Sequence, residues 1–146
     1  MVNAICTELE LRKAYLGSSK IETIYFGGGT PSLLQASFLD KILSKIYQQF
    51  SLDLQEVTLE ANPDDLQTEN LHHWKALGID RLSLGIQSFQ EEILKYYNRA
   101  HSAQEAKQAI SKAREAGFSK FSSDMIYGFP AADHTLWQAD LEEALS

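Results

Sequence analysis

Four short strand-like runs alternate with longer segments of helical periodicity, and this alternation constrains the fold of the 146-residue chain more than any other feature. Strands that alternate with helices usually pair in parallel, because each helix carries the chain back to the start of the next strand. The sequence therefore predicts an α/β fold, a partial TIM-type (β/α) barrel of about four parallel strands with flanking helices. The strands are expected near residues 21–27, 57–61, 81–87 and 120–127, and the helices near 2–16, 37–50, 68–77, 102–117 and from 135 onward.

Helix boundaries are suggested by capping residues and glycines. Ser37 is expected to cap the second helix, and Ser102 with Glu105 forms a capping box at the start of the fourth. A similar pattern at Thr135 to Gln138 is expected to open the last helix.

Side-chain parity separates the two faces of the predicted sheet, because neighbouring residues of a strand point to opposite sides. One face is aliphatic and suited to helix packing, whereas the other carries small and polar residues. An ordinary (β/α) barrel is filled with aliphatic side chains, so this lining predicts an open cavity for a polar ligand. A structural network of mutually satisfied carboxylates is the alternative. The polar set is Thr58, Glu60, Ser83, Gly85, Gln87, Ser122 and Asp124.

A glycine-rich turn, Gly27-Gly28-Gly29-Thr30-Pro31, follows the first strand. Glycines allow the backbone to approach a ligand closely and leave N–H groups free to bind it. Alone, such a turn is ordinary loop geometry. Glu60, Gln87 and Asp124 lie at the ends of the later strands, where a βα protein places its site, and they favour a binding loop.

Composition excludes some partners. The chain has 13 Lys and Arg against 20 Asp and Glu, a net charge of −7, which argues against nucleic-acid binding. No apolar run is long enough to cross a bilayer. The chain has no secretory leader pattern, and its single cysteine suits a reducing compartment, so a cytoplasmic location is expected.

Five motifs in order give the chain a resemblance to a known family. They are Gly27 to Pro31, Glu60-Ala61-Asn62-Pro63, Arg81 to Phe89, Asn98-Arg99-Ala100-His101, and Asp124 to Pro130. Together they resemble the radical S-adenosylmethionine (SAM) proteins related to oxygen-independent coproporphyrinogen III oxidase. The residues of two of these motifs are closer to those of the heme-chaperone branch of this family. The family fold is a partial (β/α) barrel.

The resemblance implies SAM and a [4Fe–4S] cluster as cofactors, with heme or a porphyrinogen as a second ligand. It also implies a set of SAM-binding positions. Glycines suit the amino-acid end of the ligand, carboxylates accept hydrogen bonds from its ammonium or ribose hydroxyl groups, and an arginine suits its carboxylate. The implied positions are Gly28, Gly29, Thr30, Glu60, Gln87, Arg99 and Asp124.

The family's cluster is held by a Cys-x-x-x-Cys-x-x-Cys run, which this sequence does not contain. Cys6 lies among apolar residues of a predicted helix and is expected to be buried and inert. We therefore expect residues 1–146 to be a single partial barrel domain, truncated at both ends, and catalytically inactive by itself. No metal ligand and no catalytic residue is assigned.

Three functions are compatible with these observations. The resemblance favours a piece of a heme chaperone that delivers heme to recipient proteins. The first alternative is coproporphyrinogen III oxidase, an enzyme of heme biosynthesis. The second is a cluster-free half-barrel that binds a nucleotide-like ligand. Because only some of these three functions are enzymatic, the sequence leaves open whether the complete protein is an enzyme.

Other candidate residues have structural explanations. The histidines match no zinc pattern and are expected to be solvated, although His101 is also a candidate for the mouth of the pocket. The large aromatic residues occupy or adjoin helical stripe positions and are expected to pack in the core. The histidines are His72, His73, His101 and His134, and the aromatic residues are Trp74, Trp137, Tyr96 and Tyr97.

Overall fold

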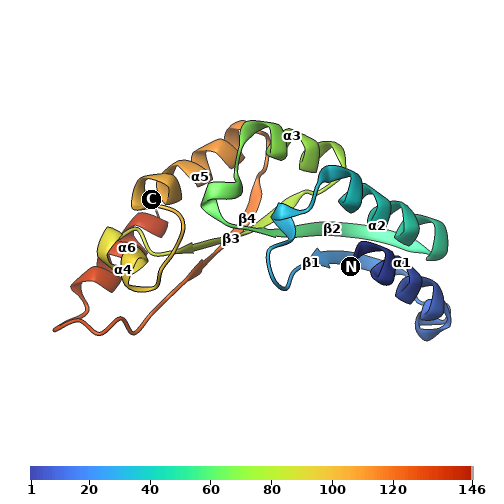
Figure 1. Cartoon of the computed structure of the whole chain (residues 1–146), viewed down its shortest axis with the longest axis horizontal. Coiled ribbons are helices and arrows are strands. Elements are labelled where there is room, and N and C mark those ends of the chain that lie inside the picture. Colours follow the sequence, from blue (N-terminus) through green and yellow to red (C-terminus); the bar gives the residue numbers. More distant parts are fainter. Residues whose placement is uncertain (146) are drawn as a thin grey trace.

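The computed structural model describes residues 1–145 as an arch with one parallel sheet (Figure 1). None of the helices within these residues is long and apolar enough to cross a membrane. The α-helices are α1 (Val2–Leu11), α2 (Ala36–Gln49), α3 (Thr68–Ala76), α4 (Glu91–Tyr96), α5 (Ala103–Glu115) and α6 (Thr135–Ala144). The strands are β1 (Ile21–Phe26), β2 (Leu52–Ala61), β3 (Arg81–Gln87) and β4 (Lys120–Met125), and short 3-10 turns lie at Lys13–Leu16, Pro31–Leu33 and Pro63–Asp65.

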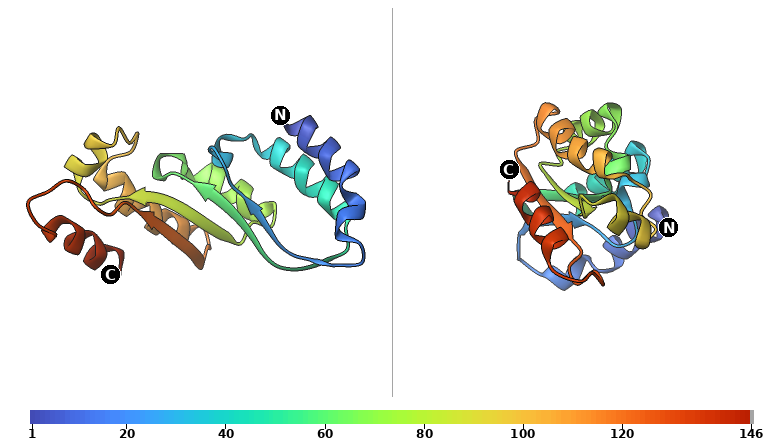
Figure 2. Two further views of the ribbon diagram at one scale, coloured as in Figure 1. Left: turned by 90° about the horizontal axis from the view of Figure 1, so that it is seen from below. Right: turned by 90° about the vertical axis from the view of Figure 1, so that its left-hand side faces the viewer.

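The sheet has the strand order β1-β2-β3-β4, and each neighbouring pair is parallel. Helices α2, α3 and α5 cover its convex face, and α1 packs beside α2 (Figures 1 and 2). Within residues 1–145, no strand pairs with the outer edge of β1 or of β4. The sheet is therefore open, which confirms the predicted incomplete (β/α) barrel.

The core lies between the sheet and the helices. Aliphatic residues of β2 and β3 point toward the helices and are almost completely buried, as parity predicts. Trp74 of α3 also lies in this core, which confirms its predicted packing. The strand residues in this layer are Val57, Leu59, Leu82, Leu84 and Ile86.

The predicted helix caps are confirmed at one of three positions. Ser102 and Glu105 form the capping box that opens α5. At Ser37 the prediction is wrong, because α2 begins at Ala36 and its cap residue Gln35 makes no side-chain hydrogen bond. Thr135 is likewise the first helical residue rather than a cap, and its hydroxyl group donates to Asp133.

Element boundaries also differ from the prediction. The first helix is α-helical only to Leu11, and a 3-10 turn follows. Strand β2 begins at Leu52, because its amino-terminal residues pair with β1 although Asp53 and Glu56 among them are charged. Helix α4 is not expected from the sequence, since a helix of six residues carries little periodicity of its own.

The aromatic residues of α4 are not in the core, contrary to the prediction. Tyr96 is 59% exposed, and its ring packs edge-to-face against Tyr97 and Phe129. Trp137 is half-buried. The short helix turns these tyrosines away from the sheet, while Ile93 and Leu94 supply its buried side.

A buried carboxylate from the last helix holds the start of α4. Asp140 of α6 is fully buried and accepts hydrogen bonds from Ser88 Oγ (2.5 Å), Phe89 N (2.8 Å) and Gln90 Nε2 (3.2 Å). These donors lie directly after β3. The last helix therefore fixes the loop that leaves the carboxyl end of β3.

Replacing Asp140 with alanine should lower the free energy of unfolding by about 2–4 kcal/mol, because it leaves buried donors without an acceptor. Glu142→Ala, an exposed position of the same helix, is the control and should have little effect. Chemical denaturation monitored by circular dichroism measures both. Equal stability of the two variants would show that Asp140 does not hold the loop after β3.

Candidate functional site

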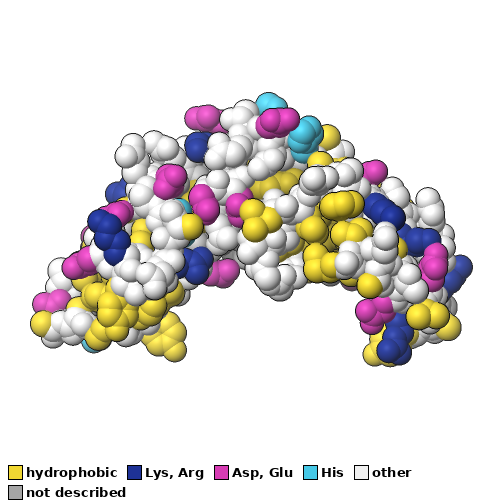
Figure 3. Space-filling model, viewed as in Figure 1, with side chains coloured by type: hydrophobic (Ala, Val, Ile, Leu, Met, Phe, Trp, Pro, Cys, Tyr) yellow, Lys and Arg dark blue, Asp and Glu magenta, His cyan; other side chains and the backbone are white. Residues whose placement is uncertain are grey.

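A polar pocket of about 220 Å³ lies on the face of the sheet opposite the helices, at the carboxyl ends of the strands. Figure 3 shows charged side chains gathered near the middle of the concave side of the arch. This is the edge at which parallel α/β proteins bind ligands. The pocket is lined by Gly29, Thr30, Pro31, Glu60, Ala61, Asn62, Ser83, Gly85, Gln87, Arg99 and Asp124.

Strand register brings the polar residues together. Glu60 of β2 lies beside Ser83 of β3, which in turn lies beside Ser122 of β4. Ser122 Oγ donates to Ser83 Oγ at 3.2 Å, and Ser83 Oγ lies 3.5 Å from a carboxylate oxygen of Asp124. The polar face predicted from parity is thus confirmed as a continuous surface.

Glu60 holds the glycine-rich loop in place. Its carboxylate accepts hydrogen bonds from the Tyr25 hydroxyl (2.8 Å) and from the Gly28 backbone N–H (3.1 Å). The hydrogen bond to Glu60 raises the pKa of Tyr25. A Cβ atom at Gly27 would lie 2.6 Å from a ring carbon of Tyr25 and 2.8 Å from Glu60 Oε1, so any other residue would force these side chains to move.

Gln87 occupies a strained turn at the end of β3. Its φ is +67°, and the Ser88 N–H donates to the Ile86 carbonyl at 2.8 Å, which makes Gln87 the centre of a γ-turn. A γ-turn with positive φ is rare and strained. Residues held in such conformations cluster at functional sites.

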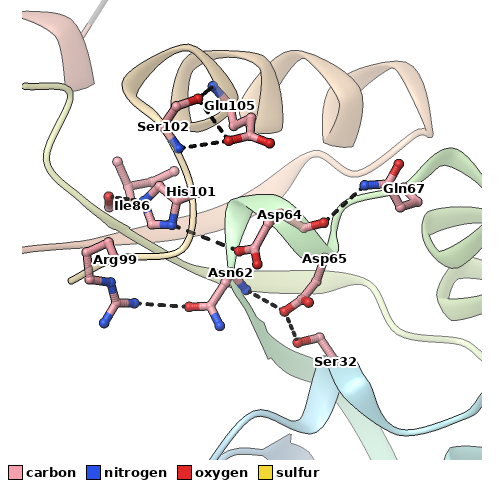
Figure 4. A network of polar contacts seen from close by, with 10 residues as sticks. All are labelled: Ser32, Asn62, Asp64, Asp65, Gln67, Ile86, Arg99, His101, Ser102 and Glu105. Carbon is pink, nitrogen blue, oxygen red and sulfur yellow. Dashed lines mark hydrogen bonds and ion pairs between the residues drawn. The ribbon is translucent and has the colours of Figure 1, made fainter. Parts of the chain in front are cut away.

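Arg99 reaches the pocket from the loop after α4. Asn98 has a φ of +49°, which reverses the chain there. One terminal nitrogen of Arg99 donates to Asn62 Oδ1 at 3.2 Å, as Figure 4 shows. The buried Nε atom has no hydrogen-bond partner among the described residues, although buried donors are nearly always paired. Arg99 therefore has a donor left for an anionic group.

Asp65 ties this arrangement to the glycine-rich loop. Its carboxylate accepts from the Asn62 backbone N–H at 3.2 Å and from Ser32 Oγ at 2.7 Å (Figure 4). Asn62, Asp65 and Ser32 are not among the predicted binding residues, although Asn62 belongs to one of the five motifs. An available signal was the Asn-Pro-Asp-Asp run at the end of a strand, which is typical of a side-chain-capped turn.

The structure brings six of the seven predicted site residues into the polar pocket: Gly29, Thr30, Glu60, Gln87, Arg99 and Asp124. Gly28 is the exception. Its backbone N–H donates to Glu60, which lines the pocket. Gly28 itself lines a neighbouring apolar cavity of about 560 Å³ beside β1.

His101 is buried, so the prediction that it is solvated is wrong. His101 comes two residues after Arg99 in the sequence, and its side chain points away from solvent. Its Nε2 atom lies 3.0 Å from the Ile86 carbonyl oxygen. His72, His73 and His134 are exposed, as predicted.

The residues present fit one implied cofactor and not the other. SAM offers an ammonium group, a carboxylate and ribose hydroxyl groups, and the pocket provides carboxylates, amides and an arginine with a free donor. A [4Fe–4S] cluster needs several thiolates, but Cys6 is the sole cysteine of the chain and is buried in the core. Among residues 1–145, no group of His, Cys, Asp and Glu converges to hold a metal ion.

Comparison with known proteins identifies the family. The model of the radical SAM superfamily matches residues 7–140, which is most of the chain. The chain belongs to the radical SAM superfamily. A solved structure agrees with this radical SAM assignment: coproporphyrinogen III oxidase (HemN) from Escherichia coli, described as a radical SAM enzyme, superposes with a TM-score of 0.84 at 25% identity, over 98% of this chain and 33% of that one.

Curated relatives refine the likeness within the radical SAM proteins. The chain is 37% identical over 127 residues to heme chaperone HemW of Lactococcus lactis, covering 86% of this chain and 34% of that protein. It is 35% identical over 147 residues to heme chaperone HemW of Bacillus subtilis, covering 99% of this chain and 39% of that protein. The chain thus spans little more than a third of these relatives.

Gly85→Ala should disturb the pocket while leaving the fold in place. The added methyl group would lie 2.9 Å from Asn62 Oδ1 and 3.0 Å from Gln87 Nε2, so both side chains must move. We expect SAM affinity to fall by about tenfold, which corresponds to roughly one lost hydrogen bond. Isothermal titration calorimetry measures the affinity.

Gly17→Ala is the control for this variant. Gly17, unlike Gly85, has a positive φ, and its added methyl group would meet nothing within 4 Å. It should cost stability through backbone strain and leave affinity unchanged. Unaltered SAM binding by Gly85→Ala would show that Asn62 and Gln87 do not shape the binding site.

Proposed function

We propose that this chain forms the SAM-binding part of a radical SAM heme chaperone. The observation that carries the proposal is the convergence of Glu60, Gln87, Arg99 and Asp124 from separate elements on one polar pocket of a radical SAM domain. The glycine-rich loop forms the remaining wall, held by Glu60.

Each group in the pocket has a role in this proposal. Arg99 binds the cofactor carboxylate through its unpaired Nε–H and a terminal N–H, in a charge-assisted contact. Glu60 and Asp124 accept hydrogen bonds from the ammonium group or from ribose hydroxyl groups. Gln87 offers both a donor and an acceptor, while Gly29 and Thr30 allow close approach to the amino-acid end.

The proposal for the complete protein is delivery of heme to recipient proteins. It is supported by relatives named heme chaperone HemW at 35% and 37% identity, higher than the 25% identity to HemN. Oxidation of coproporphyrinogen is the second candidate, favoured by the HemN superposition. A cytoplasmic location belongs to the proposal, because a reducing compartment suits an iron–sulfur protein and a lone cysteine.

Arg99→Met should weaken SAM binding by roughly 10- to 100-fold, because it removes charge-assisted hydrogen bonds to the carboxylate. Arg12→Met, at an exposed arginine beyond α1, should leave affinity unchanged. Calorimetric titration of both variants and the parent chain measures the difference. Equal losses in the two variants would contradict a specific role for Arg99.

A second ligand makes this test sharper. 5′-Methylthioadenosine has the nucleoside but lacks the amino-acid end, so Arg99→Met should bind it as well as the parent chain does. An equal penalty for both ligands would place Arg99 elsewhere in the site. Absence of any SAM binding by the parent chain would overturn the proposed function.

The chain by itself should be unable to cleave SAM reductively, because its single buried cysteine cannot hold the cluster that supplies the electron. After treatment with iron, sulfide and dithionite, 5′-deoxyadenosine should not exceed the level of a protein-free control by liquid chromatography. Production above that level, abolished by Arg99→Met, would show that the chain holds a functional cluster.

A further inference from the structure

The strained turn at Gln87 is supported by a residue outside the pocket. The Ile86 carbonyl, which closes the γ-turn with the Ser88 N–H at 2.8 Å, also lies 3.0 Å from His101 Nε2. A carbonyl oxygen only accepts, so Nε2 carries the ring proton and donates. The two hydrogen bonds on one oxygen hold the turn that aims Gln87 into the pocket.

The other ring nitrogen of His101 faces the 3-10 turn after β2. Its Nδ1 atom lies 4.0 Å from Asp64 Oδ1, and Asp64 belongs to the same 3-10 turn as Asp65 (Figure 4). The side chain of His101 is 1% exposed. Asp64 Oδ1 and Arg99 Nε are buried without a hydrogen-bond partner among the described residues.

From this geometry we infer that His101 is a positioning residue of the cofactor pocket, which holds Gln87 in its strained conformation. The inference rests on the proposed function for its ligand. The γ-turn carries strain that the local sequence does not offset, so a tertiary contact must maintain it. His101 is the side chain that hydrogen-bonds the closing carbonyl.

Two substitutions separate the hydrogen bond from the volume of the ring. His101→Phe fills the space without a donor, whereas the amide nitrogen of His101→Gln can reach the position of Nε2. We expect His101→Phe to lose about tenfold in SAM affinity and His101→Gln to recover most of it. Equal losses in the two variants, or no loss in His101→Phe, would overturn the inference.

A matched core variant separates a specific loss of SAM affinity from a loss caused by general destabilisation of the fold. Ile79→Val lies in the core before β3, at the end of the strand away from the pocket. It should lower the melting temperature and leave SAM affinity unchanged. A loss of affinity in Ile79→Val comparable to that of His101→Phe would show that the ligand responds to general destabilisation, and the positioning role would fall.

A readout without ligand keeps this inference separate from the proposed function. In the free chain, hydrogen exchange at the Ser88 amide reports the γ-turn directly. Exchange should accelerate in His101→Phe and stay near the parent rate in His101→Gln. Unchanged protection in His101→Phe overturns the positioning role even if SAM binds, whereas failure of the parent chain to bind SAM while Ser88 responds overturns the proposed function alone.

Discussion

The parallel register between β2, β3 and β4 is the constraint on which the site depends. Because Leu59 lies beside Leu82 and Glu60 beside Ser83, the buried aliphatic side chains of β2 and β3 face the helices and the polar side chains of the pocket face the open side. A slip of one residue would exchange the two faces and expose the core. Burial of the leucines therefore fixes the pocket, although none of them contacts it.

Small residues make room for the polar contacts that the register creates. Gly27 lets Tyr25 and Glu60 meet, and Gly85 lets the side chains of Asn62 and Gln87 lie across the strand. The loops then complete the pocket: the hydrogen bonds from Ser32 and Asn62 to Asp65 join the walls after β1 and β2. Preorganisation of this kind reduces the ordering cost of binding a flexible ligand.

The sequence allows prediction of the sheet, its two faces and most of the pocket, because parity and strand ends are local properties. Helix α4 could not be predicted in the same way, since Asp140, far along the chain, accepts from the residues that begin it. The burial of His101 could not be predicted either. Its partner is the backbone carbonyl group of Ile86, and a backbone partner is not identified by residue type. Tyr96 and Tyr97 lie outside the core, contrary to the prediction, because periodicity does not say which side of a short helix meets the sheet.

Every role proposed for the pocket residues requires that the polar face at the carboxyl ends of the strands binds SAM. Nuclear magnetic resonance titration of the chain with SAM tests it most directly. Binding at this face should shift the amide resonances of Gly29, Thr30, Gln87 and Ser88 and leave those of α1 unaffected. Changes confined to α1 and the apolar cavity beside β1, or none at saturating ligand, would contradict it.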